Sequence, residues 1–148
     1  MPIKTFRGLI PTGGQDTVTL HTNNGAIGYR IVKLEAISRT PGASADESVI
    51  KIYKVEQTAA NIDGVIDFND QTLIGVAYWS AATSSGSPAT MNIIVENEIF
   101  NQDIFITHKN VSTGGSEACN YYLELEQVKL DLNENTVATL KDIRNIQG

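Results

Sequence analysis

The chain contains one cysteine, Cys119, among 148 residues, so no disulfide can form within it. It also has no run approaching the roughly 18 apolar residues of a membrane-spanning helix. Basic residues are few: 11 Lys and Arg stand against 17 Asp and Glu, for a net charge of −6. The Lys and Arg are scattered singly, whereas binding to nucleic acid requires them in clusters. We therefore expect neither a nucleic-acid partner nor a membrane partner.

The N-terminus also lacks the continuous apolar core of a secretory signal, although Lys4 and Arg7 are present. The length of 148 residues fits one domain, which can bury roughly two-thirds of its unfolded surface without disulfides. Thr, Ser, Asn and Gly take up much of the composition, as is common in β-rich surfaces and turns. These features predict a single domain spanning residues 1–148.

Hydrophobic residues recur mainly at every second position, which is the periodicity of strands. Turn residues such as Asn23-Asn24-Gly25 and Asp63-Gly64 interrupt the runs. In 27–38 the alternation places Val32 with Leu34 on one face, and in 119–132 a change of phase predicts a bulge. About eight short strands at roughly ten-residue spacing predict an antiparallel β-sandwich of the jelly-roll or Ig-like kind. The expected strands are 3–10, 16–22, 27–38, 49–56, 73–80, 91–95, 103–108 and 119–132.

The two ends of the chain differ from this pattern. Residues 1–12 form a candidate N-terminal arm, since termini are often free to move. Near the C-terminus, Val137, Leu140 and Ile143 recur every three residues, which predicts a short helix within 133–146. Lys141 and Arg144 fall in its last turn, where cations complement the helix dipole.

The motifs of common enzymes are missing. No Gly-Lys-Ser/Thr follows Gly13-Gly14, and neither a Gly-x-Ser-x-Gly elbow nor a His-Glu-x-x-His pair occurs. Cys119 is expected to be a small buried hydrophobe, because a catalytic thiolate needs a base beside it. His21 and His108 are the only histidines, and we expect both to be structural or surface residues. The sequence predicts a non-enzymatic protein without a cofactor.

Three residue groups keep a second interpretation open. An oxygen-rich stretch could bind Ca²⁺ or simply stabilise a turn, and its departure from the EF-hand pattern favours the turn. Glu124 and Glu126 share a strand face, where carboxylates are usually solvated rather than paired across a glycosidase cleft. A set of aromatic residues could stack on sugars or belong to the core. The oxygen-rich stretch comprises Asp63, Asp67, Asn69 and Asp70, and the aromatic set comprises Tyr53, Tyr78, Trp79, Tyr121 and Tyr122.

Three segments carry a resemblance to the small β-rich structural proteins of tailed bacteriophages, particularly marine ones. They are GYRIVK at 28–33, FNQDIFITHK at 100–109, and the tail from Leu130 to Ile146. The resemblance implies a virion component made in the host cytoplasm, such as a capsid decoration (cement) protein. Such a protein would bind the outer surface of the major capsid protein lattice, as a homo-oligomer on the particle.

A docking protein of this kind needs a surface that complements its partner. Lys4 and Arg7 at one end of the chain, and Lys141 and Arg144 at the other, are the candidate docking cations: they could pair with acidic capsid surface or be ordinary solvated residues. Many identical sites then multiply a modest affinity. The alternatives from the sequence are a carbohydrate-binding or lectin-like module and a tail or fibre component of the virion.

Overall fold

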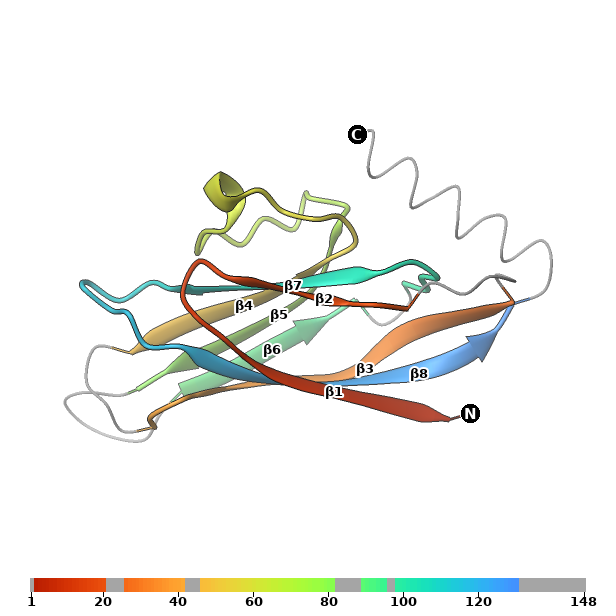
Figure 1. Cartoon of the computed structure of the whole chain (residues 1–148), viewed down its shortest axis with the longest axis horizontal. Coiled ribbons are helices and arrows are strands. Elements are labelled where there is room, and N and C mark those ends of the chain that lie inside the picture. The colour runs from red at the N-terminus through yellow and green to blue at the C-terminus, as the bar shows by residue number, and fades with distance from the viewer. Residues whose placement is uncertain (1, 21–25, 42–45, 82–88, 96–97, 131–148) are drawn as a thin grey trace.

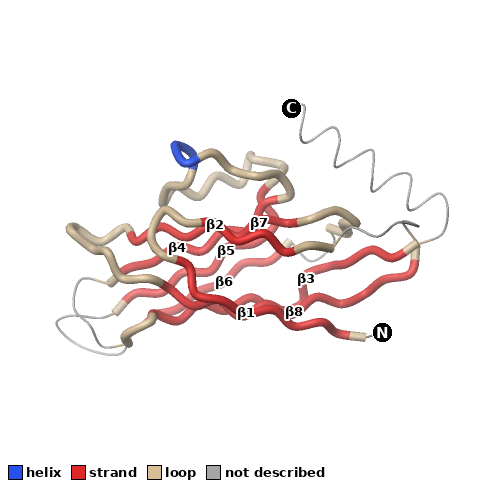
Figure 2. Tube along the Cα trace, in the orientation of Figure 1, coloured by secondary structure: helices blue, strands red, loops and turns tan. Residues whose placement is uncertain are grey.

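The computed structural model describes residues 2–20, 26–41, 46–81, 89–95 and 98–130 (Figure 1). Strands account for nearly all of its regular structure, as the tube in Figure 2 shows, with one 3₁₀ turn as the exception in the described segments. The elements are β1 (Ile3–Ile10), β2 (Gln15–Val18), β3 (Ile27–Ser38), β4 (Glu47–Tyr53), η1 (Ala59–Asn61), β5 (Leu73–Ser80), β6 (Ala89–Ile94), β7 (Ile104–Asn110) and β8 (Cys119–Lys129).

The strands form two antiparallel sheets that pack face to face (Figure 1), so the predicted β-sandwich is confirmed. The first sheet has the order β1-β8-β3, and the second has the order β2-β7-β4-β5-β6. Successive strands β1 to β4 alternate between the two sheets. Later in the chain, β7 lies between β2 and β4 in the second sheet, and β8 lies between β1 and β3 in the first. These pairings are those of a jelly roll, with β6 kept beside β5 in the second sheet.

The core lies between the sheets and follows the two-residue period of the strands. In β8, Cys119, Tyr121, Leu123 and Leu125 are buried, whereas Tyr122 and Glu124 lie on the opposite face. From the second sheet, Ile50, Ile52, Ile104 and Ile106 pack against this row. The predicted alternation of β8 is therefore confirmed.

The irregularity in the first sheet lies on β3 rather than on β8, so the predicted bulge in 119–132 was wrong. The register between β3 and β8 shifts between Ile31 and Lys33, while β8 runs on unbroken. Because of the extra residue, Ile31 and Leu34 are both buried and Val32 is exposed. The expectation that Val32 shares a face with Leu34 is corrected for the same reason.

The N-terminal segment is part of the sandwich. Residues 3–10 form β1, which pairs with β8 at every position from Ile3 opposite Glu126 to Ile10 opposite Cys119. A turn with Gly13 at φ 81° then carries the chain into the second sheet. The candidate arm 1–12 is thus mostly an edge strand. The helix expected within 133–146 lies outside the described residues, and no helix in the described part is long and apolar enough to cross a membrane.

A long loop, 54–72, covers part of the outer face of the second sheet, where it contacts Lys51 of β4 (Figure 1). The loop lies over a second apolar cluster that contains Val49, Tyr53, Leu73 and Val76. Lys51 points to this same face and is 1% exposed. Its Nζ donates to the carbonyl of Val65 at 2.6 Å and to Asp63 Oδ1 at 3.2 Å. A buried ammonium therefore fastens the loop to the sheet.

We expect Lys51→Met to lower the free energy of unfolding by about 1–3 kcal/mol, because charge-assisted hydrogen bonds are lost. Amide exchange in 54–72 should also become faster. Lys33→Met is the matched control, since Lys33 is 46% exposed and pairs with Glu35 at 3.7 Å. Chemical denaturation and hydrogen exchange measure both effects. Equal stability and equal exchange in K51M and K33M would contradict the anchoring role.

Candidate docking surface

The two N-terminal cations lie on opposite faces of the first sheet. Arg7 pairs in register with Tyr122, whose side chain points outward, and Lys4 pairs with Leu125 of the core row. Both are exposed at the sheet edge. Lys4 Nζ lies 5.7 Å from the centroid of the Tyr29 ring, at cation–π distance. Among the described residues Arg7 has no ion-pair partner.

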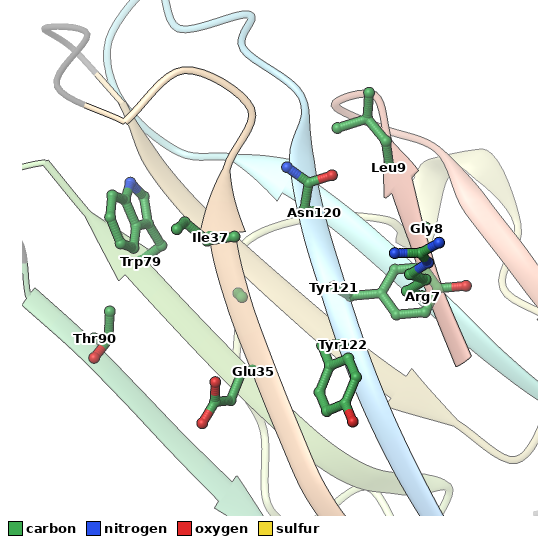
Figure 3. A pocket seen from close by; sticks show the side chains of 11 residues that line it. Arg7, Gly8, Leu9, Glu35, Ile37, Trp79, Thr90, Asn120, Tyr121 and Tyr122 are labelled. Carbon is green, nitrogen blue, oxygen red and sulfur yellow. The ribbon is translucent and has the colours of Figure 1, made fainter. Parts of the chain in front are cut away.

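A groove of about 700 Å³ lies beside Arg7, chiefly on the outer face of the first sheet (Figure 3). The sheet register explains its composition. Arg7, Tyr122 and Glu35 occupy one cross-strand row, and Leu9, Asn120 and Ile37 occupy the next. Figure 3 shows Trp79 and Thr90, from the second sheet, at its far side. The groove therefore combines the guanidinium of Arg7, the carboxylate of Glu35 and apolar surface.

Leu9 and Ile37 supply that apolar surface. Leu9 is 44% exposed and Ile37 is 48% exposed, although both belong to regular strands. Their outward position follows from the alternation that buries Ile10 and Leu34 instead. Exposed aliphatic side chains beside an unpaired Arg are the composition expected of a protein contact. We define the docking surface as Arg7, Leu9, Glu35, Ile37 and Tyr122.

The carboxylates Glu124 and Glu126 are already occupied. The Tyr122 hydroxyl donates to Glu124 Oε2 at 2.7 Å, and this hydrogen bond raises the pKa of Tyr122. Arg30 Nη2 donates to Glu126 Oε1 at 3.0 Å. The two carboxylates lie side by side on one strand face rather than across a cleft. This arrangement differs from the facing pair that glycoside hydrolysis needs.

The aromatic residues are distributed over three surfaces. Tyr53 and Tyr78 belong to the apolar cluster on the outer face of the second sheet. Tyr121 is in the core, and its hydroxyl donates to Asp16 Oδ2 at 3.1 Å. Trp79 is buried. Trp79, Tyr121 and Tyr122 line the groove of Figure 3, but Tyr53 and Tyr78 lie on the outer face of the second sheet, so the five do not form a common sugar-stacking platform.

The acidic stretch of loop 54–72 is built from side-chain turns. Asp67 Oδ1 accepts from the backbone N–H of Asn69, and Asp70 Oδ1 accepts from the N–H and hydroxyl of Thr72. Asp63 accepts from Lys51 and Val65. Each carboxylate thus stabilises its own turn. The described residues contain no group of three or more His, Cys, Asp or Glu side chains arranged to hold a metal ion.

Buried polar groups gather at one end of the sandwich. Asp46 Oδ1 accepts from Ser48 Oγ and from Asn110 Nδ2, each at 3.2 Å. Because Ser48 donates to Asp46, these side chains do not form a Ser-His-Asp relay. Cys119 is buried as predicted, and burial raises the pKa of its thiol to about 12. A thiol with this pKa is protonated and weakly nucleophilic at neutral pH.

His108 is fully buried, which agrees with its expected structural role, whereas His21 lies outside the described residues. The Nδ1 atom of His108 lies 2.8 Å from the carbonyl of Ile10, so Nδ1 carries the proton and donates. Its Nε2 is buried and has no hydrogen-bond partner among the described residues. Burial lowers the pKa of His108, although the nearby Asp46 opposes the shift. The imidazole is therefore neutral in the folded chain.

Lys141 and Arg144 lie outside the described residues, so of the four expected docking cations the structure places Lys4 and Arg7. Leu9, Ile37 and Tyr122 were not expected as docking residues. For Leu9 the sequence did hold a signal: Leu9 is two residues from Arg7 on a predicted strand, so the two side chains share a face. No protein-family model matches this chain, and no curated protein matches it at a significant level.

The depressed pKa of His108 predicts acid sensitivity. The unfolded chain takes up a proton near the ordinary histidine pKa of 6.5, whereas the folded chain resists it. The contribution of His108 to the free energy of unfolding is therefore full above pH 6.5. It is lost as the pH falls through the lower pKa that His108 has in the folded chain. Urea denaturation at several pH values should show this decline.

His108→Gln tests the assignment, because glutamine removes the titrating group and leaves every carboxylate in place. We expect the variant to be less stable than the wild type at neutral pH but to lose less stability on acidification. Parallel pH profiles for the two proteins would show that His108 is not the responsible group.

Proposed function

We propose that this chain is a non-enzymatic structural protein of a tailed-phage virion. Its most specific role would be capsid decoration, in which it binds the outer surface of the major capsid protein lattice. The observation that carries the proposal is the docking surface, where Arg7, which has no ion-pair partner among the described residues, lies one row from the exposed Leu9 and Ile37 on a regular sheet. The jelly-roll sandwich supplies that sheet.

The chemistry of the docking surface suits an acidic protein partner. A guanidinium can take a carboxylate in two parallel hydrogen bonds, which adds orientation to attraction. Burial of Leu9 and Ile37 against the partner removes apolar surface from water. Since both side chains are held by regular strands, little conformational entropy is lost on binding. A lattice of identical sites then turns a modest single affinity into stable occupancy.

The non-enzymatic part of the proposal draws on the buried groups. The thiol of Cys119 has a raised pKa, and Ser48 donates to Asp46. The carbohydrate-binding alternative is less favoured, because Trp79 and Tyr121 are buried where they line the groove, and Tyr53 and Tyr78 lie on the outer face of the second sheet. A tail or fibre component would use the same docking chemistry. The location of the chain on the virion distinguishes such a component from a decoration protein.

The direct test mixes the purified chain with empty capsid shells of the phage that encodes it. Co-sedimentation measures occupancy, and cryo-electron microscopy locates the chain on the shell. Regular density on the outer capsid lattice would support decoration. Density confined to the tail would assign the chain to a tail or fibre component. Absence from the virion, together with binding on a glycan array, would overturn the proposal in favour of a lectin-like module.

We expect Arg7→Glu to weaken binding to capsid shells by about tenfold, because it places a carboxylate opposite an acidic partner. Lys129→Glu changes the net charge equally, but Lys129 lies at the far end of β8, opposite Ile27. It serves as the matched control in the co-sedimentation assay.

Equal losses in R7E and K129E would mean that overall charge, and not the docking surface, controls binding. Point substitutions are preferable to deletion of residues 1–10 in this assay. Deletion would remove β1 and leave one side of β8 unpaired, so that lost binding could reflect lost folding.

A further inference from the structure

β6 is the outer strand of the second sheet. It pairs with β5 from Gly75 opposite Ile94 to Ser80 opposite Ala89. No strand in the described part of the chain pairs with its other side. An edge strand presents unpaired backbone N–H and C=O groups, and these can accept a strand from another molecule. The side chains of β6 decide whether such a strand is accepted.

The outward row of β6 is apolar and exposed. Met91 is 64% exposed, Ile93 is 44% exposed, and Val95, directly after the strand, is 40% exposed. The three occupy alternate positions and therefore share one face. Ile93 lies beside Val76 and Met91 lies beside Tyr78 on β5, so the row continues the outer face of the second sheet.

Charge sets β6 apart from the other edges. Residues 89–95 read ATMNIIV and contain no charged side chain, in a chain whose net charge is −6. The edge strand β1 carries Lys4 and Arg7, and β3 carries Arg30, Lys33 and Glu35. β2 is only four residues long and includes Asp16. Charges and shortness are the usual protections of an edge, and β6 has neither.

One contact holds β6 in a fixed orientation. Asn92 Nδ2 donates to the carbonyl of Leu34 on β3 at 2.8 Å, which bridges the open side of the sandwich. The bridge turns Asn92 inward, and Met91 and Ile93 consequently face outward. The apolar row is thus presented in a defined geometry before any partner arrives.

We propose that the free edge of β6 binds β6 of a second copy of this chain in an antiparallel pair about a two-fold axis. Such a pair centred on Ile93 places Ile93 opposite its own copy and Met91 opposite Val95, all on one face. Residues 91–95, which face one another in this pair, contain no charged side chain, so two copies of this acidic chain meet there without like charges facing each other. The paired edges join the two second sheets into one continuous sheet.

The test is the oligomeric state of the full chain, measured by sedimentation over a wide range of concentration. We expect the wild type to form a dimer and Ile93→Lys to sediment as a monomer, because two ammonium groups would meet at the axis. Ile3→Lys is the matched control: Ile3 is 47% exposed, but it lies on β1 of the first sheet and outside the docking surface. The control should remain a dimer.

A second variant tests the register. Ile93→Cys should give a disulfide-linked dimer on mild oxidation, since residues directly opposite in an antiparallel pair lie within disulfide reach. Cys119 is buried and does not compete. Val32→Cys, at an exposed site on β3, should stay unlinked in the same conditions.

A wild type that remains monomeric at every concentration, or a dimer that persists unchanged in I93K, would overturn the pairing. Neither result bears on capsid docking, because Arg7 and Ile93 belong to different sheets. Conversely, a chain that dimerises through β6 but never binds capsid shells would remove the proposed function and leave this inference intact.

Discussion

The packing of β8 against the second sheet is the interaction on which the rest of the molecule depends. β8 lies between β1 and β3, and its inward row from Cys119 to Leu125 is buried against the isoleucines of the second sheet. Once that row faces inward, the intervening residues must face outward, because successive side chains alternate. Tyr122 and the groove beside it are the reverse side of the same packing. The docking surface is therefore a geometric consequence of how the core is filled.

The second sheet differs from the first in that both of its faces carry apolar residues, so each face needs a cover. Its inner face packs on the first sheet, and part of its outer face is covered by loop 54–72, which the ammonium of Lys51 fastens in place. The cover does not hide the outward row of β6. Among the exposed apolar side chains of the described residues are those of the docking surface and those along β6. Arg7 belongs to the first of these surfaces, whereas residues 89–95 of the second contain no charged side chain.

The strand pattern could be predicted to within a few residues, because a two-residue hydrophobic period has one efficient solution, a sheet with one buried face. The long loop around Asp63 and Asp70 was less predictable. Its carboxylates are compatible with ion binding or with turns in the sequence, and the choice rests on which N–H groups lie within reach. In the folded chain those groups are the neighbouring backbone N–H of Asn69 and Thr72.

The sequence by itself determined the β-sandwich class, the burial of Cys119 and the inward row of β8, because each follows from local periodicity and composition. Tertiary structure alone decided the position of the bulge on β3 and the pairing of β1 along β8. These features depend on which strands meet and in which register. The pairing of segments that lie far apart in the sequence depends on how whole sheets fit together, and no local sequence pattern specifies it.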